Sequence, residues 1–234
     1  SKKEKNDKVF FVTFAAVIML PTVILNSAYW GQCDSIYTTF IILTLLYLYR
    51  EKYHRAFMFL GIAFAFKMQT IFIFPFIICF YIYKKQFSIF ELLITVFTFW
   101  ISGIGAFVQG RSLLDPFRIY ANQTGTYQYM HVNFPSFWMF VGNDYEWLKT
   151  AAIVMAAGIC GMGLYIIMKR KLDCSRPENF VSIASWFIWT CVLFLPAMHE
   201  RYAYPLEILL VILTCINKDY LKYSSVAILF SLFT

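Results

Sequence analysis

The chain has 234 residues, of which 60% are hydrophobic and only 14% are charged. Soluble domains carry about 25% charged residues, so this composition excludes an ordinary water-soluble domain. The apolar residues fall in long blocks, and the net charge of +7 is spread over short loops without forming a basic stripe. These patterns predict an all-α, polytopic transmembrane helical bundle and argue against a nucleic-acid partner.

Eight or nine apolar segments predict a single transmembrane domain over residues 1–234. A membrane-spanning helix needs about 20 residues. The short segments 56–66 and 70–83 meet at Lys67, so they predict a broken or re-entrant pair. Residues of about 109–148 predict a long outer loop with short amphipathic pieces. The expected apolar segments are 9–25, 35–49, 56–66, 70–83, 88–108, 149–168, 180–197, 206–216 and 222–234.

The distribution of basic residues predicts the orientation, because cytoplasmic loops of membrane proteins are rich in Lys and Arg. We place the N-terminus of this chain in the cytoplasm and let the segments alternate. Of the 20 Lys and Arg, the outer side then keeps only five, which are Lys67, Arg111, Arg118, Lys149 and Arg201. The protein is therefore expected to be a multi-pass integral membrane protein in contact with membrane lipids. Its abundance of Phe, Ile, Lys and Tyr favours a bacterial plasma membrane over the endoplasmic reticulum.

The ends of the chain suggest that it is part of a larger protein. It begins at Ser1 without an initiator Met or a signal peptide, and it ends within an apolar run. We therefore expect an N-terminal helix and a first outer loop to precede it.

A polar cluster between the first two apolar segments carries the first candidate site. Trp30, Gln32 and Asp34 lie close to hydrocarbon, where ionisable groups are costly and usually functional. Trp beside Gln or Asp suits a sugar ring. Trp30 could equally be an interfacial anchor, and Asp34 could cap the helix that follows.

Two further outer clusters carry charge. Lys67, with Gln69 beside it, lies in an apolar stretch and is a candidate phosphate ligand, with snorkelling to the surface as the alternative. His199, Glu200 and Arg201 are three adjacent ionisable residues. They predict a site for an anionic head group, in which Glu200 orients His199 or Arg201, or else a plain interfacial loop. No cofactor is predicted, and a divalent metal stays possible although no acidic cluster with His has ligand spacing.

Four motifs resemble one family in its order along the chain. They are Leu25–Tyr37 (a W-G-Q-x-D loop), Phe66–Thr70 (a K-x-Q turn), His131–Trp138 (an N-x-x-x-x-W stretch) and Met198–Pro205 (an H-E-R-Y-x-x-P loop). Together they are similar to bacterial membrane mannosyltransferase-like proteins. These belong to the GT-C superfamily and are related to the second mannosyltransferase of GPI-anchor synthesis.

The resemblance implies a glycosyltransferase that moves mannose or another hexose from a polyprenyl-phosphate donor to a glycan or lipid-linked acceptor outside the cytoplasm. It adds Asn133 and Tyr202 to the substrate-binding candidates. Such enzymes typically invert the anomeric centre and use a carboxylate in the first outer loop as general base. We expect that loop to precede this chain, so Asp34 does not simply inherit the catalytic role and is kept as a candidate.

Two other classes of function fit the same sequence. A transporter or flippase for lipid-linked sugars also needs intramembrane charges, although transporters often contain repeats and none stands out here. A polysaccharide polymerase would keep charged outer loops as well. An acidic residue in a preceding outer loop would favour the transferase, whereas a repeated half would favour the transporter.

Overall fold

The computed structural model describes residues 2–123 and 126–232 and is all-α apart from one short strand pair. The strands, β1 and β2, have two residues each. The elements in chain order are α1 (Lys2–Ile18), α2 (Pro21–Val23), η1 (Ile24–Tyr29), α3 (Asp34–Tyr49), α4 (Tyr53–Phe66), η2 (Met68–Ile73), α5 (Phe74–Lys84), η3 (Ile89–Glu91), α6 (Leu92–Ile101), α7 (Ile104–Val108), α8 (Asp115–Gln123), β1 (His131–Val132), η4 (Phe137–Phe140), α9 (Tyr145–Arg170), α10 (Pro177–Phe194), β2 (Met198–His199), η5 (Glu200–Ala203), α11 (Tyr204–Ile216), η6 (Lys218–Tyr220) and α12 (Leu221–Leu232).

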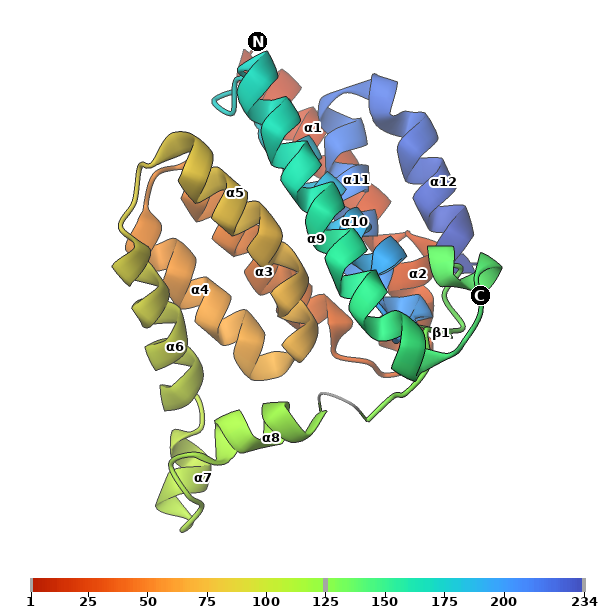
Figure 1. Cartoon of the computed structure of the whole chain (residues 1–234). Helices are drawn as coiled ribbons and strands as arrows, with labels where there is room; N and C mark the ends of the chain where they lie inside the picture. The colour runs from red at the N-terminus through yellow and green to blue at the C-terminus, as the bar shows by residue number, and fades with distance from the viewer. Residues whose placement is uncertain (1, 124–125, 233–234) are drawn as a thin grey trace.

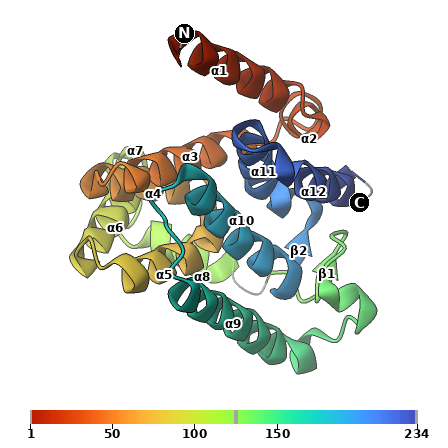
Figure 2. The ribbon, with the colours of Figure 1, turned by 90° about the horizontal axis from the view of Figure 1, so that it is seen from above.

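The chain runs back and forth between two ends of a helical bundle (Figure 1). Helices α3 to α6 lie on one side, where α4 packs between α3 and α6. On the other side α10 and α11 pack together, with α9 against α10 and α1 and α12 against α11 (Figure 2). The longer helices overlap the expected apolar segments, and the all-α prediction is confirmed.

Two expected segments are interrupted. The first breaks before Pro21, and its halves, Asp7–Ile18 and Pro21–Tyr29, meet at an angle of 52°. Proline has no backbone N–H to donate and disfavours a continuous helix through its position. The fifth segment divides at Ser102 and Gly103 into α6 and α7. The expected break at Lys67 is present as well, because Lys67 has an extended backbone (φ −157°, ψ 133°) between α4 and η2.

The long segment between α7 and α9 contains short elements. It includes the nine-residue helix α8, the strand β1 and the helical turn η4. Strand β1 pairs in parallel with β2, so that His131 lies opposite Met198 and Val132 opposite His199. This pairing joins the long segment to the loop between α10 and α11, which lies at the same end of the bundle (Figure 1).

Aromatic side chains fill much of the core. Tyr37, Phe57, Phe76, Phe180 and Phe187 are fully buried and belong to one continuous cluster across both sides of the bundle. Large rings bury much apolar area at little entropic cost, and their edges and faces pack against one another.

A glycine allows a close helix crossing. A Cβ on Gly61 of α4 would lie 2.6 Å from the backbone oxygen of Thr95 in α6. The Thr95 hydroxyl also donates to the backbone oxygen of Phe57, at 3.0 Å. Small residues let helix backbones approach in this way.

Of the described helices, α9 alone is both long and apolar enough to cross a membrane by itself. The bent pair Asp7–Ile18 and Pro21–Tyr29 passes the same test when its halves are taken together. Four shorter apolar helical stretches of 10–17 residues lie between residues 34 and 101. Only 22% of the apolar stretch of α9 is buried inside the protein. The structure thus supports at least one candidate span, and the multi-pass arrangement stays a prediction.

Candidate functional site

A buried ion pair joins two of the expected clusters. Asp34 at the start of α3 has no exposed surface, and its carboxylate pairs with the ammonium of Lys67, whose side chain is 13% exposed. Asn26 of η1 donates from Nδ2 to Oδ2 of Asp34 at 2.8 Å. Asp34 is the first residue of α3, and Cys33 is its N-cap position. The carboxylate therefore holds neighbouring side chains together, and the alternative of an Asp34 helix cap is wrong.

The break between α4 and η2 brings Lys67 to this carboxylate. The extended backbone at Lys67 directs the chain out of α4, and the Lys67 ammonium also lies 5.5 Å from the centre of the Tyr37 ring. A carboxylate and an aromatic face both stabilise a cation in a site with little water. Snorkelling does not describe this lysine, because its head group is directed to a partner within the protein.

The third cluster lies beside the second. Gln69 lies close enough to interact with the hydroxyl of Tyr202, and Tyr202 packs against the imidazole of His199 with ring centres 5.1 Å apart. The ring of Tyr127 also packs against His199, with ring centres 4.6 Å apart. The candidates Gln69, Tyr202 and His199 therefore form one contiguous group.

His199 has a pKa below its ordinary value. Burial is the main cause, and the cations of Arg201 and Lys67 act in the same direction, while Glu200 opposes them. The His199 Nδ1 atom lies 3.8 Å from a carboxylate oxygen of Glu200. At neutral pH the imidazole is therefore mainly uncharged, and it can serve as a hydrogen-bonding group but not as a fixed cation.

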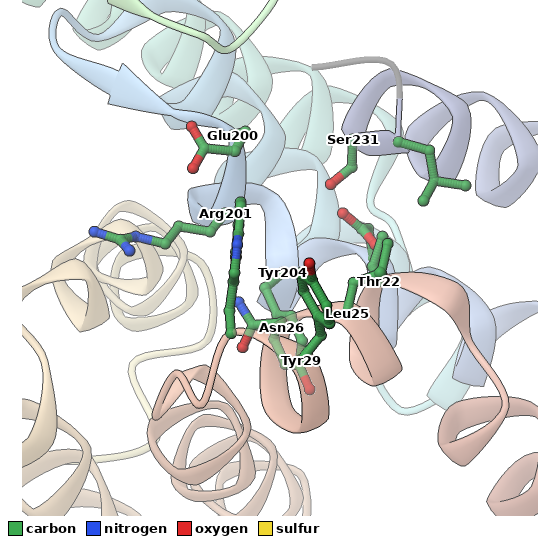
Figure 3. A pocket seen from close by; sticks show the side chains of 11 residues that line it. Thr22, Leu25, Asn26, Tyr29, Glu200, Arg201, Tyr204 and Ser231 are labelled. Atoms are coloured by element: carbon green, nitrogen blue, oxygen red, sulfur yellow. The ribbon is translucent and has the colours of Figure 1, made fainter.

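A pocket of about 240 Å³ opens next to these residues (Figure 3). It lies between η1, η5, the first turn of α11 and the end of α12. In Figure 3 the Arg201 guanidinium points away from Thr22 and Ser231, which lie at the opposite side of the pocket. The residues lining it are Thr22, Leu25, Asn26, Tyr29, Trp30, Glu200, Arg201, Tyr204, Glu207, Ser231 and Leu232.

Several polar atoms around this pocket are buried without a hydrogen-bond partner in the part of the chain that the structure describes. They include Oδ1 of Asn26, Oε2 of Glu200, Nε of Arg201 and both carboxylate oxygens of Glu207. Buried polar groups are nearly always satisfied, so a concentration of unsatisfied ones calls for an explanation by solvent or ligand.

Of the predicted residues, Trp30, Glu200 and Arg201 line the pocket, and Gln32 and Asn133 are among those that do not. Gln32 is half-buried, and its backbone N–H donates to the backbone oxygen of Asn26 at 3.0 Å, beside Gly31 with its left-handed φ of 62°. Asn133 is exposed and also has a positive φ, of 58°. It forms an isolated antiparallel bridge with His199. Both residues shape the backbone around the site.

The sequence interpretation missed four polar residues of the site. Asn26, Tyr37 and Tyr204 looked like ordinary parts of a loop or an apolar helix. Glu207 carried a clear signal, because a carboxylate within the expected apolar segment 206–216 is costly and usually functional.

No group of three His, Cys, Asp or Glu side chains within residues 7–123 and 126–232 could hold a metal ion. The possible divalent metal stays an untested expectation.

No family model matches this chain, and neither a curated protein nor a solved structure matches it significantly. The resemblance to the GT-C superfamily therefore rests on the four sequence motifs alone.

Proposed function

We propose that this protein is a membrane glycosyltransferase. It would transfer a hexose from a polyprenyl-phosphate donor to a glycan or lipid-linked acceptor on the non-cytoplasmic side. The observation that carries the proposal is the convergence of the motifs at one end of the bundle. Asp34 pairs with Lys67, Gln69 lies beside Tyr202, and Asn133 bridges to His199.

The surface of α9 supports a lipid environment for the bundle. Ile153, Val154, Met162 and Tyr165 are each more than half exposed. Contiguous apolar surfaces of this kind are rare on soluble monomers and mark contact with membrane or partners. A polyprenyl tail would lie against such a surface while its anionic head group reaches the polar end of the bundle.

The two cations of the site, Lys67 and Arg201, would have different roles. Lys67 is neutralised by Asp34, so it would position the loops and contribute little net charge to a phosphate. Arg201 borders the pocket, and its Nε atom lacks a partner among the described residues. A guanidinium can bind phosphate through two parallel hydrogen bonds. Arg201 would therefore hold the donor phosphate and stabilise it as the leaving group, because fixed positive charge acts where negative charge develops.

The test uses full-length protein in lipid with a panel of radiolabelled polyprenyl-phosphate sugars and extracted cell acceptors. We expect label transfer from one donor, and a loss of about a hundredfold in Arg201→Ala. Arg201→Lys should keep part of the activity. Arg118→Ala is the matched control, since Arg118 lies in α8 and its side chain is 63% exposed.

Normal transfer by Arg201→Ala would refute the role of Arg201. Failure of every donor with a folded protein would refute the proposal. A flippase is then the second candidate, because the helix bent at Pro21 and the break at Lys67 are discontinuous helices of the kind found in transporters. Movement of a labelled lipid-linked sugar across vesicles would identify that activity.

A further inference from the structure

Glu207 is the least expected member of the pocket. It belongs to the first turn of α11 and has no exposed surface. The hydroxyls of Ser231 and Thr22 lie close enough to interact with its carboxylate. Neither carboxylate oxygen makes a well-formed hydrogen bond within the described chain. Burying a carboxylate in this way is costly, so the site is built for a group that completes its hydrogen bonds.

The unsatisfied atoms around the pocket include both hydrogen-bond acceptors and hydrogen-bond donors. An ionised Glu207 and the Oδ1 atom of Asn26 accept hydrogen bonds, whereas Nε of Arg201 can only donate. The orientation of the Asn26 amide is fixed, because its Nδ2 donates to Asp34. An ammonium ligand would satisfy the acceptors but face Arg201, and a phosphate would satisfy Arg201 but face Glu207. Hydroxyl groups donate and accept, so a polyhydroxylated ligand matches the whole set.

The size and lining of the pocket further restrict the class of ligand that it can hold. Its volume of about 240 Å³ is below the roughly 300–1,000 Å³ of pockets that hold drug-sized molecules. Tyr29, Trp30 and Tyr204 supply aromatic surface to the lining. The C–H faces of a pyranose ring are apolar, whereas its rim carries the hydroxyls, so a single sugar ring fits both features.

We propose that this pocket binds one hexopyranose ring and that Glu207 accepts hydrogen bonds from its hydroxyls. We place the sugar of the donor in this pocket and its phosphate at the Arg201 side. This placement rests on the proposed function. Glu207 is then a binding residue that selects for hydroxyls, in the part of the pocket that Thr22 and Ser231 border.

The experiment measures binding without requiring transfer. Full-length protein in lipid nanodiscs is titrated with methyl hexopyranosides of gluco, galacto and manno configuration, by saturation-transfer NMR and calorimetry. We expect saturable binding of at least one glycoside. Glu207→Leu should weaken it about tenfold or more, since hydrogen bonds to charged groups are the strong ones. Glu207→Gln, which keeps one acceptor oxygen, should lose less.

Glu146→Leu is the matched control, because the Glu146 side chain is 67% exposed on α9, and it should bind as the unmodified protein does. Folding of each variant is checked by its thermal transition. Unchanged binding in Glu207→Leu would overturn the inference. Saturation by ethanolamine or inorganic phosphate in place of the glycosides, or no saturable binding because the pocket holds only water, would overturn it as well. Glycoside binding that depends on Glu207 in a protein without transferase activity would refute the proposed function alone.

Discussion

Asp34 and Lys67 depend on each other at the residue scale. Both are largely removed from water, and each is the other's counter-ion. Lys67→Met would leave a carboxylate with no exposed surface and only the amide of Asn26 as a partner. Breaking a buried pair from one side costs about 3–5 kcal/mol. We therefore expect the melting temperature to fall by about 10 °C, measured by thermal unfolding in detergent.

The double variant Asp34→Asn with Lys67→Met separates charge from shape. It removes both charges, so no unpaired ion stays buried, and we expect its melting temperature to recover most of the loss. If the two single variants and the double variant were equally stable, the pair would contribute nothing to folding. Loss of transfer in the stable double variant would show that the pair also positions the loops of the candidate site.

At the scale of elements, helix packing is best tested at Gly61, where the atoms that an added Cβ would meet include backbone atoms of α6. Gly61→Ala would place a methyl group against the backbone of Thr95 in α6, which cannot move as a side chain can. Overpacking of this kind costs about 1–3 kcal/mol. We expect the melting temperature to fall by about 5 °C.

The matched control for this change is Gly158→Ala in α9, where an added Cβ meets no atom within 4 Å. That variant should be neutral or slightly more stable, because alanine restricts the unfolded chain and favours helix. A similar loss in both variants would show that the loss does not arise from the contact between α4 and α6.

At the scale of the whole molecule, the sequence predicts the helices from the lengths of the apolar blocks and the break at Lys67 from its lone cation. Both are local signals. The bend before Pro21 was not predicted, although proline gave a reason for it. The pairing of Lys67 with Asp34 could not be predicted from the sequence. Nor could the packing of His199 against Tyr127 and Tyr202. They depend on contacts between segments far apart in the chain, which hydropathy does not encode.

The arrangement of the whole chain in a membrane is open to direct test. The basic loops gather at one end of the bundle and the candidate site at the other, because successive helices run in opposite directions (Figure 1). In a variant whose six native cysteines are replaced, single cysteines are introduced at two exposed positions. Ser112→Cys lies between α7 and α8, and Gln86→Cys follows α5. A membrane-impermeant maleimide on intact cells should label Ser112→Cys at once and Gln86→Cys only after permeabilisation.

The reverse pattern would place the basic loops outside and would contradict the orientation inferred from them. Labelling of both positions only after permeabilisation would mean that neither end reaches the outer surface. In that event the exposed apolar face of α9 would have to be covered by a protein partner, because it cannot remain in water at low cost. Labelling as expected would place Arg201 and Glu207 on the non-cytoplasmic side, since η5 and the start of α11 lie at the same end as α8 (Figure 1).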